Sequence, residues 1–211
     1  MNEGAALSLD TLRARIAALE GGRVSRRREP TGVQWLDGLL RGLPTPGLVE
    51  VLSTPGMGAT SLVAQIVAAS TRREQLCAWV DVEQQLYPPA LVDHGVDLRY
   101  LLIVRPTPGH GGWAAEQLLR SGNFRHVVVS GLQRLGRMGR RWAQSAEKGC
   151  CSGIIVSRKG RKDLPAHLRL SVQDEQVTVL KDRTGLFGCV VEQPRPSGAA
   201  EPWQWRHWSA K

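Results

Sequence analysis

The sequence predicts an α/β fold in which helices flank a mostly parallel central sheet. Through the middle of the chain, short continuous apolar segments alternate with helical patterns, which is typical of a parallel sheet covered on both faces. The last third changes to alternating apolar and polar residues with short turns, which indicates a smaller antiparallel extension. A separate helical pattern lies near the amino terminus and predicts an N-terminal helix.

The N-terminal helix has an apolar face formed by Leu9, Leu12, Ile16 and Leu19, and the pair Gly21-Gly22 ends it. The basic stretch GGRVSRRREPTG follows and is interpreted as a linker. Its arginines, 26–28, have two interpretations, a solvated surface or a nucleic-acid contact. We therefore expect three regions: the helix and basic linker over residues 1–30, the core over residues 31–192, and a tail over residues 193–211.

The core is predicted to begin with a strand at 48–52, a Gly-rich turn and a helix at 60–70. Further strands are predicted at 76–80, 101–104, 127–129 and 154–156, with helices at 113–120 and 133–147. The antiparallel strands are predicted at 167–172, 176–180 and 187–191. The tail carries Trp203, Trp205 and Trp208, which either pack on the core as a terminal strand or anchor a partner.

Composition excludes several classes of protein. The chain has 211 residues and a formal charge of +9, with no apolar run near the roughly 18 residues of a membrane span. The amino terminus lacks the pattern of a secretory signal, and the four cysteines lack zinc-ligand or disulfide-framework spacing. We expect a cytoplasmic protein with no membrane partner. Its positive charge is compatible with an acidic partner such as nucleic acid and with a place at the nucleoid.

The turn after the first core strand has the layout of a phosphate-binding loop. In the pattern G-x-x-x-x-G-K-[ST], backbone N–H groups cradle the phosphates, the lysine neutralises them, and the hydroxyl holds Mg²⁺. Gly56, Gly58 and Thr60 keep the shape of this loop, whereas Ser53 replaces the first glycine and Ala59 replaces the lysine. A methyl group carries no charge, so we expect a degenerate loop.

The strand at 127–129 should end in a metal-binding aspartate, but Ser130 stands there. Loss of a cationic clamp alone commonly costs about 10³-fold or more in phosphoryl-transfer rate. We therefore expect no ATPase activity, no catalytic residue, no metal site and no cofactor, while weak residual ATP binding through the loop N–H groups remains open.

The order of segments from about residue 31 to residue 183 resembles the RecA recombinase core. The stretches that carry this resemblance are TGVQWLDGLLRGLPTPGLVEV, CAWVDVEQ, LLRSGNFRHVVVSGLQRL, and LRLSV followed by VTVLKDR. The resemblance implies that Glu83 corresponds to the glutamate that activates water. It also implies that Lys181 and Arg183 correspond to basic residues that reach a neighbour's nucleotide across a filament interface.

Several positions depart from the RecA pattern. Ala90 lies near the usual adenine-stacking position, with Tyr87 close by, and Ser157-Arg158 replaces a nucleotide-sensing Asn-Gln pair. Both DNA-binding loops are short. These departures, with the N-terminal helix and the Trp-rich tail, resemble the ImuA branch, which is often described as SulA-like.

That resemblance implies a non-catalytic adaptor in SOS-induced translesion synthesis, with RecA and an ImuB-type polymerase-like protein as partners. The alternatives are a SulA-like cell-division inhibitor and an ATP-dependent, DNA-binding RecA paralogue. The face formed by Leu9, Leu12, Ile16 and Leu19 would dock on a RecA core, or else pack on its own core.

Basic residues also predict DNA contact by non-specific electrostatics, which weakens as salt rises. The candidates are Arg134, Arg137, Arg140, Arg141, Arg158, Lys159, Arg161 and Lys162. The competing interpretation is a solvated or salt-bridged face.

Overall fold

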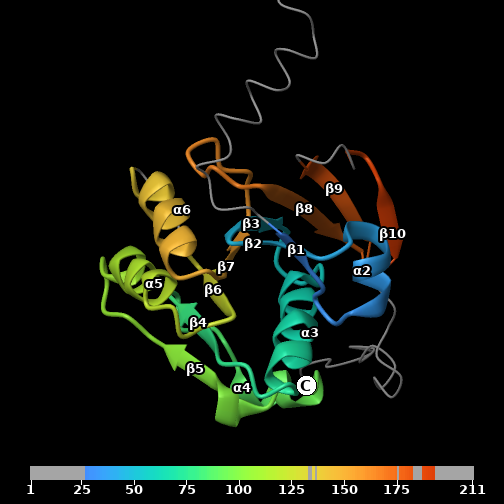
Figure 1. Cartoon of the computed structure of the whole chain (residues 1–211). Coiled ribbons are helices and arrows are strands. Elements are labelled where there is room, and N and C mark those ends of the chain that lie inside the picture. Colours follow the sequence, from blue (N-terminus) through green and yellow to red (C-terminus); the bar gives the residue numbers. More distant parts are fainter. Residues whose placement is uncertain (1–26, 133–134, 136, 175, 183–186, 193–211) are drawn as a thin grey trace, which may run out of the picture.

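The computed structural model describes residues 27–132, 135, 137–174, 176–182 and 187–192 (Figure 1). The predictions for the N-terminal apolar face, for the three tail tryptophans, for Arg134 and for Arg183 fall outside these residues and stay predictions.

The described chain alternates strands and helices. In order the elements are β1 (Arg27–Glu29), α2 (Gln34–Leu40), β2 (Leu43–Thr45), β3 (Gly47–Leu52), α3 (Ala59–Thr71), β4 (Cys77–Asp81), α4 (Pro88–Asp93), the 3-10 helix η1 (Leu98–Tyr100), β5 (Leu101–Val104), α5 (Gly111–Arg120), β6 (His126–Ser130), α6 (Met138–Lys148), β7 (Ser152–Ser157), β8 (Leu168–Gln173), β9 (Gln176–Asp182) and β10 (Val190–Glu192).

The main sheet has eight strands within the described residues, in the order β10-β9-β8-β3-β7-β6-β4-β5. The strands from β8 to β5 all run parallel to their neighbours, and β9 and β10 are antiparallel additions at one edge. The predicted fold, a mostly parallel sheet with a small antiparallel extension, is confirmed.

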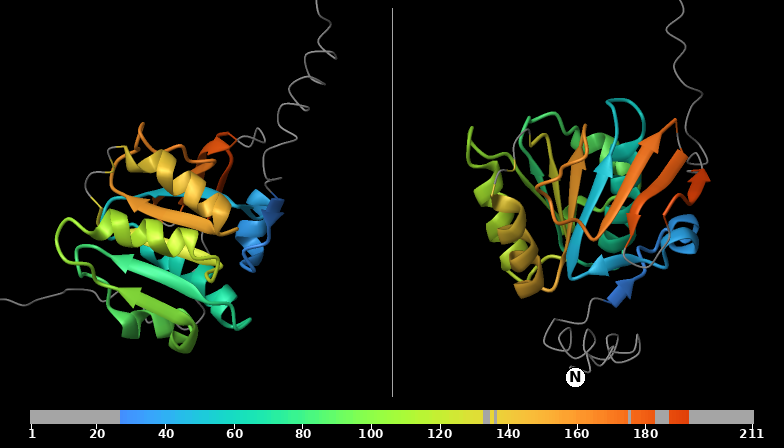
Figure 2. Two further views of the ribbon diagram at one scale, coloured as in Figure 1. Left: turned by 60° about the vertical axis from the view of Figure 1, so that its left-hand side comes forward. Right: turned by 90° about the horizontal axis from the view of Figure 1, so that it is seen from above.

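Helices cover the sheet on two faces (Figure 2). Alternate residues of each central strand point to opposite sides, so Leu48 joins the core beneath α5 and α6, whereas Val49 joins the core beneath α3. Both residues are fully or almost fully buried. Two apolar cores thus hold the central strands, which explains why these strands are continuously apolar in the sequence.

Strand β8 differs from its prediction. It was expected to be antiparallel, but it pairs in parallel with β3 on one side and antiparallel with β9 on the other. Its alternating pattern has another cause: Leu168, Leu170 and Val172 are buried, while Arg169 and Ser171 lie on the opposite, partly exposed face. Alternation records burial on one face and does not fix the strand's direction.

The predicted linker contains a strand. β1 pairs antiparallel with β2, Arg28 forms an ion pair with the buried Asp182, and Glu29 pairs with Arg125. The interpretation of the arginine run as solvated surface is therefore wrong for Arg28. The basic helix α6 begins at Met138, whereas the sequence places its start at residue 133.

No helix among the described residues is long and apolar enough to cross a membrane. The four cysteines are free, and burial raises the pKa of Cys77 and of Cys151 to about 12. These two buried thiols therefore stay protonated at neutral pH and are poor nucleophiles.

Candidate functional site: a cleft at the carboxyl edge of the sheet

A cleft of about 950 Å³ lies where four parallel strands end. Strands β3, β4, β6 and β7 end at Leu52, Asp81, Ser130 and Ser157, and the segments that follow them line the cleft. Ligands of open α/β sheets bind at this edge, because the loops that follow parallel strands gather there. The sequence-predicted residues Gly56, Gly58, Ala59, Thr60 and Glu83 line or border it.

The Gly-rich turn keeps a compact path into α3. Met57 N–H donates to the Thr54 carbonyl at 3.2 Å, and Ser53 N–H donates to the Ser157 carbonyl of β7 at 3.1 Å. Gly58 is the N-cap of α3 with φ 94°, a left-handed conformation that favours glycine. The turn therefore joins β3 to α3 through glycines in a left-handed conformation, as the Gly-rich pattern predicts.

The two charged groups expected of such a site are replaced by uncharged ones. Ala59 is buried, and its methyl group belongs to the apolar core with Leu62. Ser130 accepts a hydrogen bond from Trp79 Nε1 of the neighbouring strand at 3.0 Å. The floor of the cleft carries neither an ammonium group at position 59 nor a carboxylate at position 130.

Asp81 carries the carboxylate at the end of β4, and three groups of the surrounding chain contact it. It accepts the backbone N–H groups of Gln85 and Leu86, each at 3.0 Å, and it lies 3.5 Å from Arg105 Nε. Arg105 in turn donates to the Leu86 carbonyl at 2.9 Å. Asp81 thus stabilises the turn that presents Glu83.

Glu83 is paired within the chain. Its carboxylate lies 3.4 Å from Arg158 Nη2, which comes from the segment after β7. Gly131 packs against its other side, because a Cβ atom there would lie 2.8 Å from Glu83 Cγ. The carboxylate that resembles a water-activating group is therefore held by a cation where β7 ends.

A double-mutant cycle tests this pair. We expect Glu83→Gln and Arg158→Gln to be coupled by only about 0.2–1 kcal/mol in the free energy of unfolding, because Arg158 is largely exposed. Urea denaturation of the four proteins measures the coupling. A value indistinguishable from zero at low salt would show that the pair contributes nothing to the stability of the fold.

A second charge network lies beneath the cleft and was not predicted. Glu50, in the middle of β3, is fully buried and accepts Arg169 Nε at 2.5 Å and the Arg161 backbone N–H at 3.0 Å. Arg169 also donates to the Arg161 carbonyl at 2.6 Å. The Arg161 side chain donates to the Leu132 carbonyl and, at 3.2 Å, to Ser157 Oγ. This network ties the segment 157–163 to β3, to β8 and to the end of β6.

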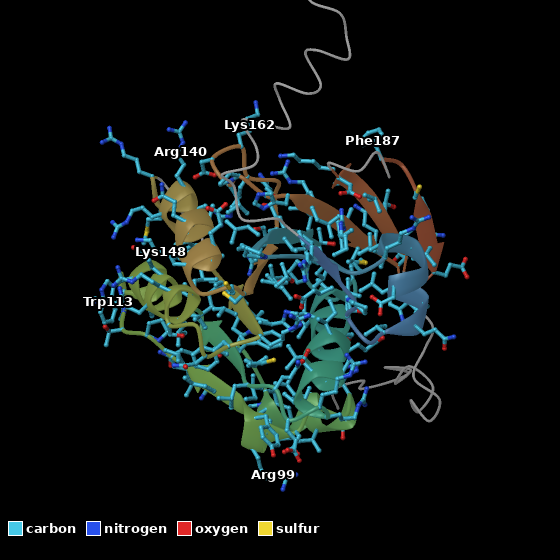
Figure 3. The ribbon with its side chains drawn as sticks, viewed as in Figure 1. Arg99, Trp113, Arg140, Lys148, Lys162 and Phe187 are labelled. Carbon is cyan, nitrogen blue, oxygen red and sulfur yellow. The ribbon has the colours of Figure 1, made fainter. Side chains whose placement is uncertain are left out.

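The predicted DNA-binding residues fall in two neighbouring places. Arg137, Arg140 and Arg141 are exposed at the start of α6, whereas Arg158, Lys159, Arg161 and Lys162 lie beside the cleft. The two places adjoin, because a Cβ atom at Gly139 would lie 2.3 Å from the Asp163 carbonyl oxygen. Figure 3 shows Arg140 and Lys162 projecting at the same end of the molecule.

The part of the chain that the structure describes holds no group of three His, Cys, Asp or Glu residues able to bind a metal ion. Tyr87, Ala90 and His94 line the cleft beside the Glu83 turn. Tyr87 is exposed, so it offers an aromatic ring close to Ala90, which stands near the usual adenine-stacking position without an aromatic side chain.

The RecA N-terminal domain family matches residues 26–137, just over half of the chain. The chain belongs to this family. The matched RecA segment contains β3, the degenerate turn, α3, the Asp81–Glu83 turn and β6, which together form most of the cleft.

Relatives named Protein RecA match shorter stretches. The chain is 35% identical to that of Rhizobium etli over 95 residues, which are 44% of this chain and 26% of the relative. It is 36% identical to that of Ruegeria pomeroyi over 95 residues, 44% of this chain and 27% of the relative. It is 35% identical to that of Mesorhizobium japonicum over 109 residues, which are 50% of this chain and 30% of the relative. The matches thus span less than a third of the length of these RecA proteins.

Sequence reasoning missed Glu50, Asp81 and the Trp79–Ser130 hydrogen bond. A signal existed for Glu50, since it is the only charged residue in the apolar strand LVEVL. A carboxylate in a central strand needs a buried cationic partner. Its partner Arg169 lies 119 residues away in the sequence, and periodicity cannot find it.

Proposed function

We propose that this chain is a non-catalytic RecA-like accessory protein in SOS-induced translesion DNA synthesis. It would act by contacts with RecA and with an ImuB-type polymerase-like protein rather than by turning over ATP. Membership of the RecA N-terminal domain family and the resemblance to the ImuA branch support this role.

One observation carries the non-catalytic part of the proposal. The Gly-rich turn and the cleft are present, but Ala59 packs in the core at the lysine position, and the uncharged Ser130, which accepts a hydrogen bond from Trp79, stands at the aspartate position. Phosphoryl transfer depends on positioning and on charge stabilisation, which these two residues cannot supply.

ATP turnover tests this part. We expect the purified chain, with Mg²⁺, ATP and single-stranded DNA, to hydrolyse no more ATP than its Glu83→Gln variant does. DNA-stimulated turnover in the parent chain that disappears in Glu83→Gln would favour the alternative, an ATP-dependent RecA paralogue. Glu83 and Thr60 at the cleft are the observations that favour that alternative.

Pull-down with purified RecA tests the partner. The predicted docking face lies in the N-terminal segment, so Leu12→Asp combined with Ile16→Asp should abolish retention of RecA. Undiminished retention would remove this helix from the proposal. If the chain blocks polymerisation of the division-ring protein and does not bind RecA, this result would instead support a SulA-like inhibitor.

A further inference from the structure

Helices α5 and α6 pack side by side in parallel register, and three contacts fix their positions. Trp142 Nε1 donates to the Gly112 carbonyl at 3.0 Å, and Arg141 Nε and Nη2 donate to Glu116 Oε1 at 3.2 and 2.9 Å. At the far end, a Cβ atom at Gly149 would lie 2.0 Å from the Leu119 carbonyl oxygen. The start of α5 therefore lies beside the start of α6, and their ends also adjoin.

This packing leaves an outward surface that we call the outer basic face. On α6 and its N-cap residue Arg137, the positions 137, 140, 141, 144 and 148 fall within a stripe about 100° wide and about 16 Å long. On α5, the positions 113, 117 and 120 form the matching stripe. The face comprises Trp113, Gln117, Arg120, Arg137, Arg140, Arg141, Gln144 and Lys148.

Most cations of this face have no ion-pair partner among the described residues, and Glu147 is the one carboxylate of α6 at the edge of the face. Among the described residues, neither Arg120, Arg137, Arg140 nor Lys148 forms an ion pair with a carboxylate. Arg141 alone is paired, with the buried Glu116. Two nitrogens of Arg141 donate to this carboxylate, so an arginine of α6 already binds a carboxylate where the two helices meet.

Trp113 lies on α5, the helix that packs beside this basic helix. It follows Gly112, whose carbonyl accepts a hydrogen bond from Trp142 Nε1 of α6, and 59% of its surface is exposed. Figure 3 shows Trp113, Arg140 and Lys148 on the side of the molecule that α5 and α6 cover. The sequence separates Trp113 from the basic helix by more than a strand, and only the fold brings them together.

We propose that the outer basic face binds an acidic amphipathic helix of a protein partner. A third helix packs naturally along two parallel ones, with carboxylates over the arginines and an apolar residue on Trp113. Tryptophan and arginine are enriched at the energetic centres of protein interfaces, whereas lysine is depleted there, and this face has four arginines to one lysine. The inference goes beyond the proposed function, because the face lies across the sheet from α3 and does not need an inactive cleft.

The test uses a labelled 18-residue peptide of Glu and Leu at helical spacing, and the same peptide with Gln in place of Glu. We expect the Glu peptide to bind the full chain, and Trp113→Ala, Arg120→Gln or Arg140→Gln each to weaken it at least about tenfold. The Gln peptide should not bind. Arg99→Gln removes an exposed cation far from this face and should change nothing (Figure 3). Circular dichroism of each variant verifies folding.

Three results would overturn the proposal. Unchanged peptide affinity in all three face variants would show that the peptide binds elsewhere, and no binding of the Glu peptide would show a solvated face. Tighter binding of a 30-nucleotide oligo(dT), lost in the same variants, would assign the face to nucleic acid instead.

Discussion

Replacing Glu50 by alanine is expected to lower the free energy of unfolding by about 3–5 kcal/mol, because the change leaves the Arg169 guanidinium mostly buried without its carboxylate. The Arg161 backbone N–H also loses its acceptor. A domain of this size is typically stable by only about 5–15 kcal/mol, so this loss is a large fraction of the total. Urea denaturation followed by tryptophan fluorescence measures it.

The double variant Glu50→Leu with Arg169→Met is the matched control. Since replacing both charges removes the uncompensated ion, this protein should be more stable than Glu50→Ala. Hydrogen exchange of the segment 158–163 should rise in Glu50→Ala, because Arg161 loses one of its ties. A loss of less than about 1 kcal/mol, with unchanged exchange, would show that the network contributes little.

The part of the cleft that follows from local pattern could be predicted from the sequence. The strand β3, the Gly-rich turn and α3 follow one another in the sequence, and apolar periodicity with the two glycines of the turn predicts them. The absence of a lysine at position 59 and of an aspartate at position 130 is equally visible in the sequence, because the phosphate-loop pattern specifies a residue type at each of these positions.

The contacts that the residues of the cleft make with distant parts of the chain could not be predicted in the same way. Ser130 contacts Trp79 from the neighbouring strand, and Glu83 contacts Arg158 from 75 residues away. Such pairs depend on strand order, which a pattern along one chain does not contain. The same limit applies to Trp113, whose basic neighbours become visible only when α6 packs beside α5.

The internal pairs bear on the proposed function. Glu50 accepts the Arg161 backbone N–H and Glu83 pairs with Arg158, so two carboxylates of the same chain hold the segment 157–163. A scaffold needs a shape that does not depend on turnover. We infer that the internal pairs give the carboxyl edge such a shape.

Acidification is expected to destabilise the protein through His126 below pH 6.5. The imidazole is fully buried at the start of β6, and neither ring nitrogen has a hydrogen-bond partner among the described residues. Burial, with a smaller effect of the neighbouring Arg125 charge, lowers the pKa of His126 to about 3. The folded protein therefore keeps this ring neutral at a pH where the unfolded chain would protonate it.

The pH window follows from those two pKa values. Above pH 6.5 both states hold a neutral ring, and its contribution to stability does not change with pH. Between 6.5 and about 3 only the unfolded chain takes up the proton, so each pH unit lowers the free energy of unfolding by up to about 1.4 kcal/mol. Below about 3 the folded state is protonated as well, and the loss stops growing.

The variant His126→Leu should flatten this acid limb. Leucine fills a similar volume without nitrogen atoms to desolvate, so its stability at pH 7 should equal or exceed that of the parent chain, by up to about 1–3 kcal/mol. Urea denaturation from pH 4 to pH 8 measures the difference in the free energy of unfolding between the two proteins. The titration of the carboxylates that both proteins share cancels in this difference. Replacing the exposed His110 by glutamine controls for the loss of one imidazole. If the difference between the parent and His126→Leu stays constant across that range, then His126 is not the buried neutral base that the geometry of β6 describes.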